Sequence, residues 1–86
     1  MFKNLPPRIK FLSVHDLLPI FGSRSSVDKM RVEKLLPTPV NPYGRRIVWP
    51  EHEIELISRF IAAGLSKDEM RAKVVEITEA RKNLLK

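Results

Sequence analysis

The sequence has no cysteine, only three glycines, one tryptophan and one tyrosine. Without cysteine, the chain forms neither a disulfide framework nor a thiolate metal site. The scarcity of aromatic side chains disfavours RNA as a ligand, because unpaired bases are recognised largely by stacking on such side chains. Apolar runs are short, and none approaches the roughly 20 residues of a membrane span. We therefore expect no membrane partner.

The patterns of common catalytic sites are also missing. The two histidines are His15 and His52, and "HEIEL" at 52–56 lacks the second histidine of a zinc-protease helix. The stretch "GSRS" at 22–25 lacks the second glycine of a nucleophile elbow, and there is no glycine-rich phosphate loop. We expect no enzymatic activity, no catalytic residue, no cofactor, no metal ion and no small-molecule substrate.

Positive charge is what the sequence has in excess, with a net charge of +6. Residues 1–46 contain nine Lys or Arg and three acidic residues, whereas residues 47–86 contain seven of each sign. Such a basic surplus in one region is the electrostatic footprint of a polyanionic partner. A chain of 86 residues has room for one domain with a small core and little room for a deep pocket.

Local signals predict a mostly α-helical fold with a small β-hairpin. Pro6 and Pro7 disfavour helix, so residues 1–10 are expected to form a basic arm. The capping-box pattern "SVHD" at 13–16 predicts one helix start, and Ser23 predicts another. The second helix is expected to run to about Leu35. Because only Gly22 and its neighbour separate the two helices, they form a helix-turn-helix arrangement.

The second half of the chain predicts a hairpin and two more helices. Residues 40–49 combine an Asn-Pro and Gly turn with the strand formers Ile47, Val48 and Trp49. A third helix is expected from Pro50 to Gly64, and a capping box at Ser66 begins a fourth. The expected organisation is a basic arm (1–10), a winged helix-turn-helix DNA-binding domain (11–64) and a C-terminal amphipathic helix (65–86).

The second helix predicts a DNA-reading face. On a helical wheel Val27 and Met30 define the inner face, and Arg31 lies near its edge, where a long side chain can snorkel. N-terminal residues of a recognition helix meet base edges, while serines and cations also bind phosphates. The candidate residues are Arg24, Ser25, Ser26, Asp28, Lys29 and Arg31. The alternative is an ordinary solvated helix face.

The predicted hairpin supplies a candidate wing. Two adjacent arginines follow a glycine in the turn, where a wing reaches a phosphate backbone or a minor groove. The candidate residues are Tyr43, Gly44, Arg45 and Arg46, and Arg8 and Lys10 of the arm are expected to follow the DNA backbone. The alternative is an ordinary hairpin tip, since Gly and Arg are common there.

Residues 23–49, "SRSSVDKMRVEKLLPTPVNPYGRRIVW", resemble the AlpA-type family of phage regulators and excisionases, whose winged helix is related to the MerR type. The matching motifs are the helix start at 23–26, "LPTPV" at 36–40, Gly44-Arg45 and Trp49. The resemblance covers roughly residues 11–63. It implies a small DNA-binding protein of a prophage or integrated element in the bacterial cytoplasm, associated with the nucleoid.

That resemblance implies a role as an excisionase, as a transcriptional regulator, or as both. Its implied partners are double-stranded DNA and, beside it, an integrase or further copies of the chain on DNA. Three positions depart from the family pattern: Asp28 replaces a usual aromatic residue, Arg31 a usual aliphatic residue and Lys34 a common glycine. These departures concern the target sequence rather than the fold.

The last helix leaves a second function open. Met70, Val74, Ile77 and Leu84 follow a heptad-like spacing, with Arg81 in the same row. This face either folds back on the third helix or pairs with a partner. In the second case the chain would be a protein-interaction module that binds an integrase or a regulator.

Overall fold

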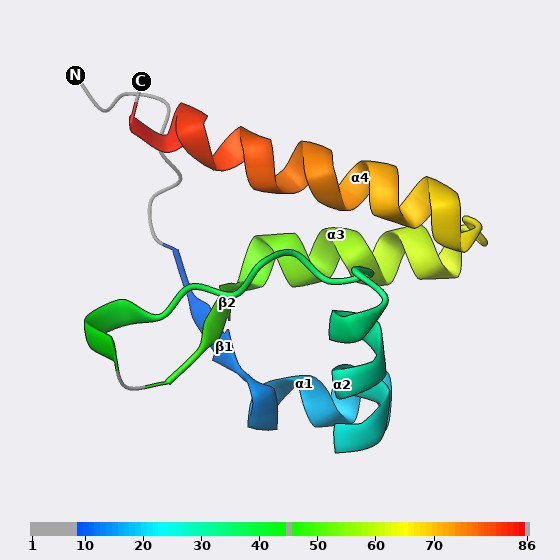
Figure 1. Ribbon diagram of the computed structural model, residues 1–86, viewed down its shortest axis with the longest axis horizontal. Helices are drawn as coiled ribbons and strands as arrows, with labels where there is room; N and C mark the ends of the chain where they lie inside the picture. Colours follow the sequence, from blue (N-terminus) through cyan, green and yellow to red (C-terminus); the bar gives the residue numbers. More distant parts are fainter. Residues whose placement is uncertain (1–8, 45, 86) are drawn as a thin grey trace.

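Four α-helices and a two-stranded antiparallel sheet make up the described part of the chain, residues 9–44 and 46–85, in a computed structural model (Figure 1). In chain order these elements are β1 (Phe11–Ser13), α1 (Val14–Phe21), α2 (Arg24–Val32), β2 (Val48–Pro50), α3 (Glu51–Ala62) and α4 (Lys67–Ala80). Two short 3-10 helices are η1 (Pro42–Gly44) and η2 (Arg81–Leu85). The expected mostly α-helical class is confirmed, and the small β component is a two-stranded antiparallel sheet.

Serine hydroxyls begin three of the helices, as predicted. Ser13 Oγ accepts a hydrogen bond from the Asp16 N–H, and the Asp16 carboxylate accepts one from the Ser13 N–H. Ser66 and Glu69 make the same reciprocal capping box at α4. At α2, Ser23 Oγ accepts from the N–H three residues later at 3.2 Å. Each cap satisfies an N–H that has no partner inside the helix.

The strand pairing differs from the hairpin expected within residues 40–49. β2 pairs mainly with β1, and on its other edge Val40 forms a single bridge to Val48 through two hydrogen bonds of 2.8 Å. The next hydrogen-bonded pairs on that edge would join residues 38 with 50 and 42 with 46. Pro42 and Pro50 have no N–H to donate, so this edge cannot extend. Strand β1, distant in sequence, takes the other edge.

Trp49 lies at the centre of the core. Its side chain is fully buried, and its indole Nε1 donates to the Pro37 carbonyl at 2.8 Å. Leu17 of α1, Val27 of α2 and Ile57 of α3 are also fully buried and belong to the same cluster. Trp49 is thus an anchor of the core as well as a strand residue. None of the helices in residues 9–44 and 46–85 is long and apolar enough to cross a membrane.

The C-terminal helix folds back on α3, and the two helices run antiparallel, side by side (Figure 1). Met70, Val74 and Ile77 of the heptad-like face are buried in the common core. Arg81, in the same row, forms two hydrogen bonds of 2.8 and 2.6 Å with the carboxylate of Glu53. Of the two arrangements open from the sequence, intramolecular packing is the one present.

Candidate nucleic-acid interface

Helix α2 presents one face to the core and the rest to solvent. Val27 is fully buried and Met30 packs against the core, as the helical wheel predicts. On the opposite side Val32 is 81% exposed. The helix ends at Val32 instead of continuing to Leu35, because Lys34 takes a left-handed conformation with φ of 61°. The N–H groups of Lys34 and Leu35 then bond to the last-turn carbonyls of Arg31 and Met30 at 3.1 and 2.8 Å.

The first turn of α2 combines exposed donors with a helix N-terminus. Arg24 and Ser25 are exposed, and their position beside unpartnered backbone N–H groups suits an anion. The Arg24 guanidinium lies 3.7 Å from the carboxylate of Asp28, so the aspartate has a cation one turn away. Ser26 is partly buried, and its hydroxyl accepts a hydrogen bond from the Ser23 hydroxyl at 3.1 Å. Among the predicted serines, Ser25 is therefore the more accessible.

Two further cations occupy different surroundings on α2. Lys29 is exposed and has no ion-pair partner within the described ranges. The Arg31 guanidinium lies over the Trp49 ring, 5.8 Å from its centroid, in a cation–π contact. This contact agrees with the expected place of Arg31 at the edge of the core. Lys29 is the cation with more freedom to meet a ligand.

The candidate wing lies on the far side of β2 from α2 (Figure 1). Gly44 has φ of 71°, a conformation that favours glycine, and its N–H donates to the Asn41 carbonyl at 3.2 Å. Arg46 is exposed. The prediction for Arg45 and for the Tyr43 side chain lies outside the described residues. The structure therefore separates α2 from η1, the described start of the candidate wing (Figure 1).

The arm residue Lys10 is attached to the domain. Its carbonyl accepts a hydrogen bond from the Glu51 N–H at 2.7 Å, and its ammonium lies 3.7 Å from the Glu51 carboxylate. The other predicted arm residue, Arg8, lies outside the described residues. Lys10 thus joins the start of β1 to the start of α3, and its charge remains largely exposed.

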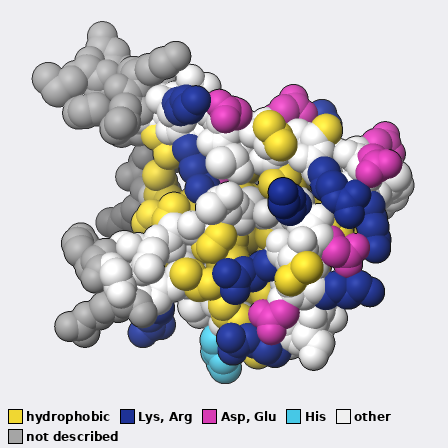
Figure 2. All heavy atoms as spheres, viewed as in Figure 1, with side chains coloured by type: hydrophobic (Ala, Val, Ile, Leu, Met, Phe, Trp, Pro, Cys, Tyr) yellow, Lys and Arg dark blue, Asp and Glu magenta, His cyan; other side chains and the backbone are white. Residues whose placement is uncertain are grey.

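Cationic and hydrophobic side chains lie among one another on the face drawn in Figure 2, with fewer acidic side chains. An open groove of about 820 Å³ lies between α2, the loop at 34–39 and α4. Val32 and Val75 (61% exposed) line it together with Arg31, Lys34 and Arg71. The groove is thus lined by three basic residues and by the acidic Asp28 and Glu79.

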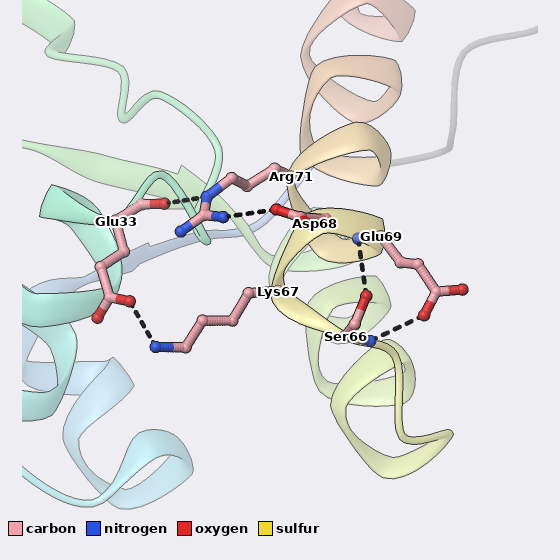
Figure 3. A network of polar contacts seen from close by, with 6 residues as sticks. All are labelled: Glu33, Ser66, Lys67, Asp68, Glu69 and Arg71. Atoms are coloured by element: carbon pink, nitrogen blue, oxygen red, sulfur yellow. Dashed lines mark hydrogen bonds and ion pairs between the residues drawn. The ribbon is translucent and has the colours of Figure 1, made fainter.

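The sequence did not predict a polar junction between α2 and α4 (Figure 3). The Lys67 ammonium donates to the Glu33 carboxylate at 2.6 Å, and this hydrogen bond holds the pKa of Glu33 below its ordinary value. Arg71 donates to the Glu33 carbonyl at 2.9 Å and to the Asp68 carboxylate at 3.0 Å. Glu33 and Arg71 are 38 positions apart, and no local pattern signals such a contact.

Known proteins provide no comparison for this site. No family model, curated protein or solved structure matches the chain. Across the described ranges, His, Asp and Glu side chains form no group of three or more that could hold a metal ion. The site is therefore interpreted from its own chemistry, which is that of exposed cations, hydroxyls and a helix N-terminus.

Proposed function

We propose that this protein binds double-stranded DNA in a sequence-specific manner and that α2 is its recognition helix. The observation that supports the proposal best is the outward face of α2. Arg24, Ser25 and Lys29 are exposed there, on a helix that is held to the core from the opposite side by Val27. Arginine, lysine and serine are side chains that contact base edges in the major groove and phosphates along it.

The order of elements supports a winged helix-turn-helix for this proposal. Gly22 and Ser23 alone separate α1 from α2, and the segment at 41–47 then leads into β2 and α3. With α2 in a major groove, that segment would meet the flanking backbone or minor groove through Arg46 and Arg45. The positive surplus within residues 1–46 favours the same partner.

The cellular role that we propose is excision or transcriptional control for a prophage or integrated element, as the resemblance to AlpA-type proteins implies. Both roles begin with the same binding step. A single domain this small makes few contacts, so we expect repeated sites, neighbouring protomers or an integrase, or DNA bending, to add specificity.

The alternative function, a protein-interaction module, depends on the C-terminal helix. Its apolar residues Met70, Val74 and Ile77 are already buried against the rest of the domain. A partner helix would have to displace that packing. This burial counts against a partner site on the same face of α4.

Selection from a pool of randomised DNA duplexes tests the proposal. We expect one preferred sequence to emerge and to compete better than its scrambled version. Arg24→Ala should relax the preference at one position by about 1–3 kcal/mol, whereas Lys82→Ala, which removes one charge from η2, should leave the preference unchanged. A pool that shows no enrichment, or equal effects of both variants, would contradict the proposal.

A further inference from the structure

The junction at Glu33 joins the C-terminal end of α2 to the first turns of α4. Glu33 is the C-cap residue of α2, and its backbone carbonyl accepts a partly buried hydrogen bond from Arg71 Nε. Its carboxylate accepts from Lys67 at the start of α4. The backbone carbonyl and the side-chain carboxylate of Glu33 are therefore each bound by a side chain of α4 (Figure 3).

These contacts complete the end of α2. The last carbonyls of a helix lack intrahelical partners and form the negative end of its dipole. The N–H groups of residues 33, 34 and 35 satisfy the carbonyls of residues 29, 31 and 30, and Arg71 satisfies that of Glu33. A guanidinium at this position adds a charge-assisted hydrogen bond, and Asp68 orients it through a hydrogen bond of 3.0 Å.

The exposed valines that line the groove do not hold α2 and α4 together in place of the polar junction at Glu33. Val32 of α2 and Val75 of α4 face the open groove and remain 81% and 61% exposed. Only Val27 of α2 is fully buried, and a helix of nine residues is marginal without tertiary contacts. The orientation of α2 is therefore set by the packing of Val27 and Met30 on the core, by its contact with α1 and by the junction at Glu33.

We propose that Arg71 is a positioning residue for DNA recognition, which fixes the angle of α2 through the Glu33 carbonyl without touching the DNA. This inference rests on the proposed function. Base contacts need precise hydrogen-bond geometry, whereas phosphate contacts tolerate small shifts of a flexible cation. Loss of Arg71 should therefore weaken binding to the preferred sequence more than binding to a scrambled duplex.

The test compares Arg71→Ala, Arg71→Lys and the control Lys73→Ala on the selected and scrambled duplexes over a series of salt concentrations. Lys73 lies on the same helix, pairs with Glu76 and lines the α3 side of α4. For Arg71→Ala we expect specific affinity to fall about tenfold, with scrambled binding and the salt slope unchanged. Arg71→Lys should recover part of the loss, and Lys73→Ala should lose none.

Hydrogen exchange of the free proteins provides the second readout. Arg71→Ala should speed amide exchange in α2 while α3 remains protected. An equal loss on both duplexes with a salt slope reduced by about 1 would make Arg71 a phosphate contact and overturn the inference. Unchanged specific affinity would also overturn it. Failure of the wild-type protein to bind any duplex would instead refute the proposed function, and the inference with it.

Discussion

Arg81 lies in the apolar row of α4, and its ion pair with Glu53 allows that face of the helix to pack against the rest of the chain. Glu53 is 1% exposed, and its carboxylate accepts a hydrogen bond from Arg81 at 2.6 Å, which raises the pKa of Arg81. Arg81 also donates to the Thr38 carbonyl at 2.7 Å. An arginine in the middle of an apolar row argues against a tight dimer seam, and here it is accommodated by partners within the same chain.

Removing Arg81 should leave a buried carboxylate without its cation. We expect Arg81→Leu to lower the free energy of unfolding by about 3 kcal/mol, measured by urea denaturation. The double variant Glu53→Leu/Arg81→Leu should recover most of that loss, because it removes both charges. Equal stabilities of Arg81→Leu and the wild type would show that the pair contributes nothing.

Some features of the candidate site could be predicted from single residues and their spacing, and others could not. The helical wheel correctly predicts that Val27 and Met30 face the core, because the period of a helix fixes both positions. It also places Arg31 at the edge of the core, where its guanidinium contacts the Trp49 ring. The bond from Arg71 to Glu33 could not be predicted, because it depends on how α4 docks on the rest of the domain.

Among the secondary-structure elements, the starts of three helices could be predicted from the sequence, because each serine cap and its partner lie within four consecutive residues. "SVHD" and "SKDE" specify reciprocal bonds that need no tertiary contact. The pairing of the strands could not be predicted in the same way. β2 has a local candidate partner at Val40, but prolines prevent that edge from extending, and its main partner is the distant β1.

The two capping boxes predict how stability depends on pH. The backbone N–H of Ser13 lowers the pKa of Asp16, and the backbone N–H of Ser66 lowers the pKa of Glu69. A carboxyl group with a lowered pKa in the folded state stabilises the protein above its unfolded-state pKa. That contribution is lost as the pH falls through the lower folded-state pKa.

The melting temperature should therefore fall as the pH is lowered from about 5 toward 2. The double variant Asp16→Asn/Glu69→Gln should melt lower than the wild type at pH 7 and show a flatter acid limb. Thermal denaturation followed by circular dichroism at a series of pH values measures both effects. Parallel curves for the two proteins would show that these caps do not produce the dependence.

For the molecule as a whole, the net charge comes from one half of the sequence, whereas the core is built from both halves. The net positive charge belongs to residues 1–46, whereas the core combines both halves through Trp49, α3 and α4. Helix α4 carries no positive surplus, with three cations against four acidic residues, and it contributes apolar residues to the core together with the junction to α2. In this account the second half of the chain supports a DNA-binding surface that the first half provides.

The measurement that tests this account most directly is the salt dependence of duplex DNA binding. We would compare the slope of log K against log salt for the wild type, Lys29→Ala/Arg46→Ala and the control Lys82→Ala. For duplex DNA binding through these cations we expect tight binding with a steep slope for the wild type, a slope reduced by about 2 in the double variant, and no change in the control. Equal slopes for all three proteins would contradict it.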